Sequence, residues 1–134
     1  MANKYVLDTH TLIWYLEGNP RLGNSAKAVM DDPTSNMVLP IIGLAEAIDI
    51  VDKRRTTISS VKILLNRTKR DMRIQIYPLT FAVLNQSLSA GAVPEMHDRL
   101  IVSTALHLQS IGNKVSLLTK DNAIIAAALV PVIW

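Results

Sequence analysis

The stretch Tyr5-Val6-Leu7-Asp8-Thr9-His10-Thr11-Leu12-Ile13-Trp14-Tyr15-Leu16 joins a strand-like apolar run to an apolar helical pattern through one acid. Asp8 is the only residue of this stretch that carries a full charge at neutral pH. Acids that serve solubility usually lie among other polar groups on the surface. Because parallel sheets place their ligand crevices beyond the carboxyl ends of strands, Asp8 is a candidate site residue.

Three further acids interrupt apolar sequence elsewhere in the chain. Glu46 stands alone in an apolar segment, on a helical stripe of isoleucines. Asp98 begins a helical pattern and lies in line with core-type positions three and four residues apart. Asp121 follows the strand-like run Val115–Leu118 and opens another helical stretch. If the fold gathers these acids with Asp8, they form a metal-binding pocket.

Each acid also has a purely structural interpretation. Asp is a favoured helix N-cap, which would account for Asp98 or Asp121 taken singly. Glu46 would then be a snorkelling or salt-bridged helix residue. The positions of the acids nevertheless favour a metal-binding site, because Asp8 and Asp121 both follow predicted strands.

Strand-like and helical patterns alternate along the chain. Strands are predicted at Lys4–Asp8, Met37–Leu39, Ile74–Tyr77, Val115–Leu118 and Val132–Ile133. Helices are predicted at Thr11–Leu16, Ser25–Asp31, Ile41–Lys53, Ser59–Asp71, Thr80–Ala90, His97–Ile111 and Asp121–Leu129. This alternation indicates an α/β fold, a three-layer α/β/α sandwich on a mostly parallel central sheet of about five strands.

Composition excludes several other classes of protein. Hydrophobic residues make up 49% of the 134 residues and aromatic residues only 4%, so the core is aliphatic and disorder is not expected. The absence of cysteine excludes a disulfide scaffold and a thiolate zinc site. The C-terminal apolar run from Ile124 to Trp134 is too short to span a bilayer and contains Pro131. Since Asp8 also interrupts any signal-peptide core, we expect a cytoplasmic protein with no membrane span.

The chain is mildly basic although its predicted pocket is acidic. The formal net charge is +3. Basic residues cluster in two segments, Lys53-Arg54-Arg55 and the set Lys62, Arg67, Lys69, Arg70 and Arg73. These residues either attract a polyanion or form a solvated helix face, and the sequence leaves both interpretations open.

Gathered carboxylates predict a particular chemistry. Several carboxylates a few ångströms apart raise one another's pKa, and a divalent cation removes that repulsion. Oxygen ligands without thiolates or paired histidines select Mg²⁺ or Mn²⁺ over Zn²⁺. Such an ion polarises a phosphate and activates water, so the natural reaction is phosphodiester hydrolysis.

Four blocks of the chain resemble, in order, the motifs of PIN domains, specifically the VapC-type toxin ribonucleases. They are Val6–Trp14, Ala45-Glu46, His97–Val102 and Leu117–Asp121. The resemblance implies a single PIN-like nuclease domain over residues 1–134, an Mg²⁺- or Mn²⁺-dependent endoribonuclease that acts as the toxin of a VapBC-like toxin–antitoxin module. It further implies an RNA substrate, a homodimer and a small antitoxin protein from an adjacent gene that covers the pocket.

The same resemblance assigns roles to residues. Asp8, Glu46, Asp98 and Asp121 would form the acidic metal-binding and catalytic set, with Asp8 and Asp98 as direct ligands and Asp121 acting partly through water. Thr9 and Thr119 would orient a carboxylate or a bound water. Arg99 would contact a substrate phosphate, or form an outward salt bridge. Apart from the resemblance, the positions of His10 two residues after Asp8 and of His97 directly before Asp98 place both at the border of the predicted pocket, as proton carriers or phosphate contacts. Metal-activated water would remove the need for a histidine base.

The chain departs from the family pattern at two places. Many relatives carry small hydroxyl residues shortly before the glutamate, where this chain has Pro40 and Gly43. Around the third acid the chain reads Pro94-Glu95-Met96-His97-Asp98, so Glu95 either competes for the metal or is an ordinary loop acid.

Two other classes of function remain open. One is a catalytically silent PIN-like module that binds RNA or protein. The other is a phosphoacceptor domain, which needs adjacent acids or a second Asp soon after the first, whereas Asp8 is followed by Thr9-His10-Thr11.

Overall fold

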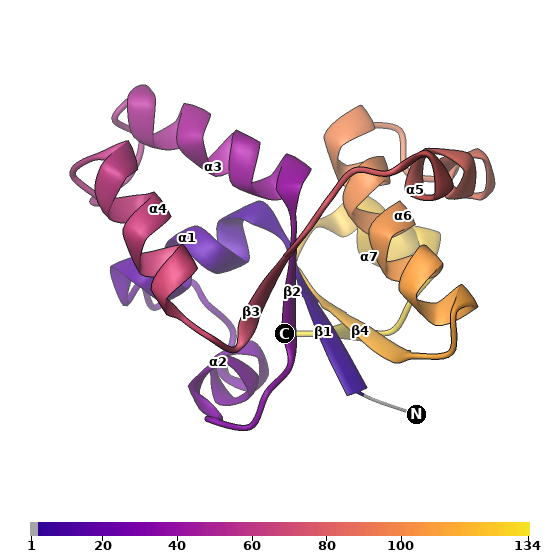
Figure 1. Ribbon diagram of the computed structural model, residues 1–134, viewed down its shortest axis with the longest axis horizontal. Helices are drawn as coiled ribbons and strands as arrows, with labels where there is room; N and C mark the ends of the chain where they lie inside the picture. The colour runs from indigo at the N-terminus through magenta and orange to yellow at the C-terminus, as the bar shows by residue number, and fades with distance from the viewer. Residues whose placement is uncertain (1–2) are drawn as a thin grey trace.

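Five parallel strands form the centre of the protein, in the order β3-β2-β1-β4-β5 (Figure 1). The structure is a computed structural model that describes residues 3–134. The strands are β1 (Asn3–Leu7), β2 (Met37–Pro40), β3 (Ile74–Tyr77), β4 (Lys114–Leu118) and β5 (Val132–Ile133). All four pairings between neighbouring strands are parallel. The predicted α/β fold is therefore confirmed, with an entirely parallel sheet.

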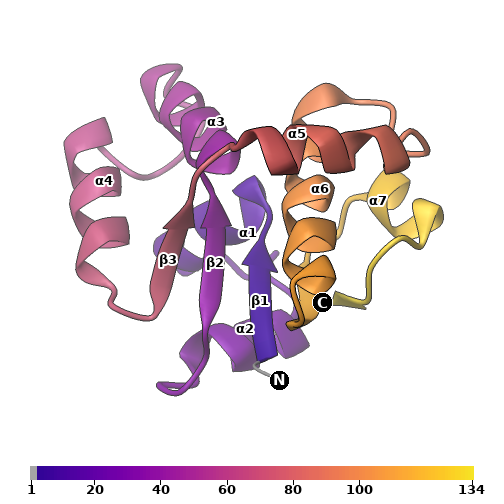
Figure 2. The same ribbon diagram turned by 45° about the vertical axis from the view of Figure 1, so that its right-hand side comes forward.

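Helices connect the strands and cover the sheet (Figure 2). They are α1 (Thr9–Glu17), α2 (Asn24–Asp31), α3 (Ile41–Asp52), α4 (Val61–Arg70), α5 (Phe81–Gln86), the 3₁₀ helix η1 (Ser87–Ser89), α6 (Met96–Ser110) and α7 (Asn122–Ala127). The predicted helix Thr80–Ala90 is in fact the two short helices α5 and η1. Within residues 3–134, no helix combines the length and the apolar character that a membrane crossing requires.

Alternation along the strands divides the core between the two faces of the sheet. Leu7 and Leu118 pack in the cluster formed with α1 to α4. Val6 and Leu117, one residue earlier, pack in the cluster formed with α6 and α7. Successive side chains of a strand point to opposite faces, so a sheet buried on both sides needs such continuous apolar runs. Figure 1 shows the two groups of helices on either side of the strands, as the three-layer prediction requires.

Helix α4 carries part of the basic sequence on its exposed face. Leu64 and Thr68 of this helix are buried. Lys62, Lys69 and Arg70 are exposed. This part of the basic cluster is therefore a solvated helix face.

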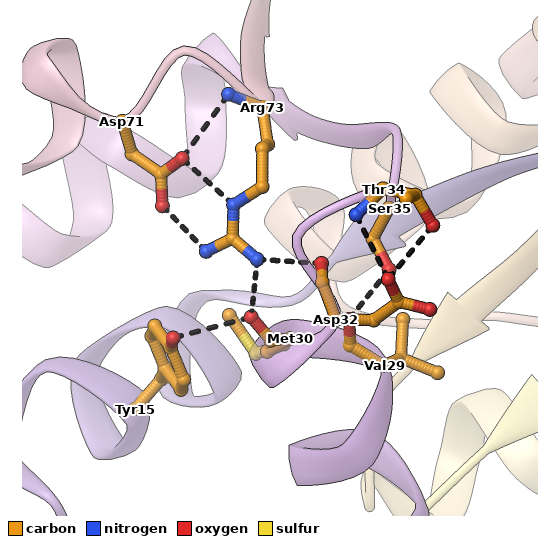
Figure 3. Close-up of polar contacts among 8 residues, drawn as sticks. All are labelled: Tyr15, Val29, Met30, Asp32, Thr34, Ser35, Asp71 and Arg73. Carbon is orange, nitrogen blue, oxygen red and sulfur yellow. Dashed lines mark hydrogen bonds and ion pairs between the residues drawn. The ribbon is translucent and has the colours of Figure 1, made fainter.

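Arg73, just before β3, has a structural role instead (Figure 3). Its Nη1 donates to the carbonyl oxygens of Met30 (2.7 Å) and Asp32 (2.8 Å) at the end of α2. Its Nε and Nη2 donate to the Asp71 carboxylate at 3.0 and 2.8 Å. Tyr15 of α1 donates to the same Met30 carbonyl at 3.1 Å. Arg73 thus satisfies the last carbonyls of a helix and joins α1, α2 and β3.

Arg73→Met is expected to lower the free energy of unfolding by about 2–4 kcal/mol, because it removes the charge-assisted hydrogen bonds that join the Asp71 carboxylate to the end of α2. Urea denaturation measures the change. Arg70→Met is the matched control, since Arg70 is exposed on α4 and should shift stability by less than about 0.5 kcal/mol. Equal stability of the two variants would contradict the role given to Arg73.

Candidate metal centre at the sheet edge

The candidate site lies at the ends of the neighbouring strands β1 and β4, which are followed by helices on opposite faces of the sheet. β1 pairs with β4 in a register that sets Leu7 beside Leu118. The chain after β1 forms α1 on one face, and the chain after β4 forms α7 on the other. A crevice opens at such a switch point in parallel sheets. The register also makes the next residues, Asp8 and Thr119, neighbours although 111 positions separate them.

Asp8 is held rigidly at the end of β1. Its side chain is buried, with 9% exposure. One carboxylate oxygen accepts from the Thr9 backbone N–H at 2.7 Å, and the other accepts from the Thr119 hydroxyl at 2.6 Å. Burial raises the pKa of Asp8, although these two hydrogen bonds oppose the rise. The Thr119 hydroxyl also accepts from the Asp121 N–H at 3.0 Å, so it links two of the predicted site residues.

Glu46 reaches the same region from α3. The Thr9 hydroxyl donates to its carboxylate at 2.8 Å, which ties α1 to α3. Burial raises the pKa of Glu46, and the nearby charge of Asp8 acts in the same direction. Glu46 therefore points inward, as its isoleucine stripe predicts.

Asp98 and Asp121 differ in how their carboxylates are used. Asp121 caps α7, because its Oδ1 accepts from the Ile124 N–H at 2.9 Å. Asp98 is not a cap: it lies in the first turn of α6, whose N-cap is Glu95. Within residues 3–134 no group donates a hydrogen bond to the Asp98 carboxylate. Burial, followed by the charges of Asp8 and Asp121, raises the pKa of Asp98 to about 7.

One cavity of about 520 Å³ receives all four predicted acids. Its lining comprises Asp8, Thr9, His10, Thr11, Trp14, Glu46, Ile50, Glu95, Asp98, Lys120, Asp121 and Asn122. Thr119 lies behind Asp8 and is fully buried. The structure thus brings together carboxylates from α3, α6 and the ends of β1 and β4.

Glu95 is more than a loop acid. Its Oε2 accepts from the Asp98 N–H at 2.9 Å, and its Oε1 lies 2.7 Å from His97 Nδ1. His97 Nδ1 is also 3.8 Å from Glu46 Oε2, so these three side chains offer ligand atoms within 4.8 Å of one another. His97 pairs with Glu95, whereas the Asp98 carboxylate accepts no hydrogen bond from residues 3–134. Glu is not a favoured N-cap, so the contact between Glu95 and the Asp98 N–H has no common sequence signature.

Arg99 donates to backbone carbonyls and forms no salt bridge among the described residues. Its Nε donates to the Val93 carbonyl at 2.8 Å, and its Nη2 donates to the Pro94 carbonyl at 3.3 Å. No acid of residues 3–134 pairs with it, so the outward salt bridge is not formed. Arg99 closes the loop before α6, because its guanidinium replaces water on two loop carbonyls.

Lys120 and Trp14 form a basic and aromatic rim beside the acids that was not predicted from the sequence. Lys120 Nζ lies 5.2 Å from the centroid of the Trp14 ring, a cation–π distance. His10, which was expected to border the pocket, lies against the same indole, with ring centroids 5.4 Å apart. The position of Lys120 directly before Asp121 was the available signal for the rim. The rim places the Lys120 ammonium group at the mouth of an acidic cavity.

Comparisons with known proteins agree with this architecture. The family model of the PIN domain matches residues 5–129. The structure of VapBC2 from Rickettsia felis, bound to a DNA fragment from its promoter, has a TM-score of 0.69 at 14% identity over 97% of each chain. DNA-bound VapBC from Salmonella typhimurium has a TM-score of 0.69 at 17% identity, covering 99% of this chain and 98% of that one. A toxin–antitoxin complex from Klebsiella pneumoniae has a TM-score of 0.66 at 15% identity, covering 97% and 96%. The comparison with curated proteins found no match.

Proposed function

The chain belongs to the PIN domain family, and from that premise we propose that it is a metal-dependent endoribonuclease, the toxin component of a VapBC-like toxin–antitoxin module. The observation that carries the proposal is the convergence of Asp8, Glu46, Asp98 and Asp121 on one cavity at the switch point of the sheet. A cavity lined by carboxylates suits a reaction in which a divalent ion neutralises phosphate charge.

The donor set fits Mg²⁺ or Mn²⁺. All four predicted ligands are carboxylates, which are hard oxygen donors. The Asp98 carboxylate accepts no hydrogen bond from residues 3–134, so both of its oxygens are free to bind an ion. Each Asp8 oxygen accepts one hydrogen bond and keeps a further lone pair. We therefore propose Asp8 and Asp98 as direct ligands, with Glu46 and Asp121 completing the set directly or through water.

When bound, the ion would polarise a phosphodiester and lower the pKa of a water molecule that attacks phosphorus. The protein's own groups would fix the geometry of that attack. Thr9 and Thr119 hold Glu46 and Asp8 in place through their hydroxyls, which is the orienting role proposed for them. Lys120 at the rim would attract the phosphate chain toward the acids. Arg99 would support Asp98 indirectly, by closing the preceding loop.

Incubation with a mixed RNA pool tests the proposed activity. We expect cleavage with Mg²⁺ or Mn²⁺ and none with EDTA, and renewed cleavage when excess metal is added back, because the acids alone cannot activate water. Undiminished cleavage in the chelated sample would refute metal dependence. Metal binding without cleavage of any RNA in the pool would instead identify a silent binding module.

We also propose two protein partners. Solved complexes with the same fold are VapBC assemblies, which supports a small antitoxin from an adjacent gene as one partner. Phe81 and Leu88, on α5 and η1, are 84% and 82% exposed, and such apolar exposure supports a homodimer. A monomeric mass in light scattering at micromolar concentration would contradict the dimer.

A further inference from the structure

We propose that a second hollow beside the acidic cavity binds the phosphate chain of the RNA next to the cleaved bond. This hollow, the arginine groove, has a volume of about 620 Å³. Its lining comprises His10, Ile13, Trp14, Glu17, Asn19, Arg21, Ile50, Arg54, Arg55, Thr56 and Thr57. It lies between α1 and the turn that follows α3. The inference rests on the proposed ribonuclease function and specifies where its substrate lies.

The groove is continuous with the acidic cavity. His10, Trp14 and Ile50 line both hollows. A ligand that follows the surface from the acids over Trp14 therefore reaches the arginines directly. An RNA strand needs such an arrangement, because the cleaved phosphate would lie at the acids while its neighbours require cations.

The arginines of the groove are free to bind. The chain has seven arginines, and three of them, Arg67, Arg73 and Arg99, donate side-chain hydrogen bonds to backbone carbonyls. The side chains of Arg21, Arg54 and Arg55 are exposed. Within the described part of the chain, none of these three forms an ion pair. A planar guanidinium without an internal partner is well suited to bidentate contact with phosphate.

One acid lines the groove, and its carboxylate oxygens are occupied by hydrogen bonds within the protein. The Glu17 carboxylate accepts from the Thr56 hydroxyl at 2.7 Å, the Thr57 N–H at 3.0 Å and Asn19 Nδ2 at 3.0 Å. These bonds lower the pKa of Glu17 although desolvation opposes the change. Glu17 thereby fastens the turn after α3 to the end of α1. The turn that carries Arg54 and Arg55 is held at the groove.

The backbone at Arg54 has a conformation that is strained for a residue with a side chain. Arg54 has a φ of 55°, the left-handed conformation in which glycine usually ends a helix. Its N–H donates to Val51 O at 3.0 Å, and the Arg55 N–H donates to Ile50 O at 3.1 Å. Glycine would satisfy the same geometry without strain. An arginine in a strained conformation beside the candidate site is the pattern expected of a functional residue.

Binding of RNA to the catalytically inert Asp98→Asn protein tests the groove. In that background, Arg54→Gln with Arg55→Gln should weaken binding of a fluorescein-labelled single-stranded RNA about 10–100-fold. The slope of log affinity against log salt should fall by about 1.4, since each lost phosphate contact on a single strand removes about 0.7. The matched control is Lys62→Gln with Lys69→Gln, which removes the same charge from the exposed face of α4. That control should change affinity less than about twofold.

Arg54→Gly separates binding from stability. Relief of the strained conformation should raise the melting temperature, while loss of the guanidinium should still weaken RNA binding at least about threefold. Ala128 has a similar φ of 51° outside the groove, so Ala128→Gly should raise the melting temperature and leave RNA binding unchanged.

The outcomes distinguish this inference from the proposed function. If wild-type protein cuts RNA but the groove variants bind RNA as the α4 control does, the groove inference is overturned and the ribonuclease stands. If wild-type protein cuts no RNA with either metal while the groove variants still lose RNA affinity, the groove is supported and the ribonuclease fails. Unchanged RNA affinity in the groove variants overturns the inference even if they lose binding to a protein partner.

Discussion

Asp98→Asn is expected to reduce metal-dependent RNA cleavage by at least about 10³-fold while the protein stays folded. The amide is neutral and a poorer ligand for a hard cation than a carboxylate. Little structure depends on the Asp98 carboxylate, because within residues 3–134 it accepts no hydrogen bond. Its charge is also disfavoured where it stands, as the rise of its pKa to about 7 shows. Cleavage rates with saturating Mn²⁺, and melting curves without metal, measure the two effects.

Asp8→Asn should abolish cleavage to a similar extent but also destabilise the fold. The Asn amide nitrogen would face the Thr119 hydroxyl, which now donates to Asp8 and accepts from the Asp121 N–H. We expect a loss of about 1–3 kcal/mol, because a buried hydrogen bond is replaced by a mismatched pair. Asp31→Asn, on the exposed face of α2, is the control for charge removal and should cleave normally. Either site variant retaining a tenth of the wild-type rate would exclude its carboxylate from the reaction.

The order of strands and helices could be predicted because hydrophobic periodicity agrees with the positions of turn and capping residues along the chain. The predicted strand Ile74–Tyr77 has the observed bounds. The helix predicted from Thr11 instead begins at Thr9, because Asp8 caps it directly. Alternation along a strand predicts which face of the sheet each side chain occupies. Helix ends are predicted less well, because an acidic N-cap such as Asp8 can move the first residue of a helix by one or two positions.

The details of the candidate site needed the register of the sheet. Asp8 and Asp121 were found because both follow strands, yet only the pairing of Leu7 with Leu118 brings Thr119 onto the Asp8 carboxylate. Glu95 was singled out as a loop acid or a competitor for the metal, but its contact with the Asp98 N–H was not predicted because an N-cap glutamate has no common sequence signature. Local patterns thus identify which acids are unusual, whereas contacts between distant segments decide what each one touches.

The metal-free protein is expected to lose stability as the pH rises from about 5 to about 8. Asp98 has a pKa of about 7 in the folded protein against an ordinary value of 3.8, and the pKa values of Asp8 and Glu46 are raised in the same direction by burial. Between the unfolded and folded pKa values the folded state holds protons that the unfolded state has released. Stability therefore falls through this window as pH rises. His97, whose pKa is raised mainly by its hydrogen bond to Glu95, adds a fall of the same sign near neutral pH.

Divalent cations should reverse this loss of stability at high pH. A bound cation would neutralise the repulsion between the carboxylates, as bound protons do at low pH. We expect the melting temperature without metal to be about 5–10 °C lower at pH 8 than at pH 5, and millimolar Mn²⁺ to restore most of it at pH 8 but little at pH 5. Asp98→Asn removes a carboxyl group whose pKa is raised to about 7, so the melting temperature of this variant should depend less on both pH and Mn²⁺. A wild-type melting temperature that rises from pH 5 to pH 8 without metal would show that these carboxylates are not crowded, and would remove the physical reason for a cation at this edge of the sheet.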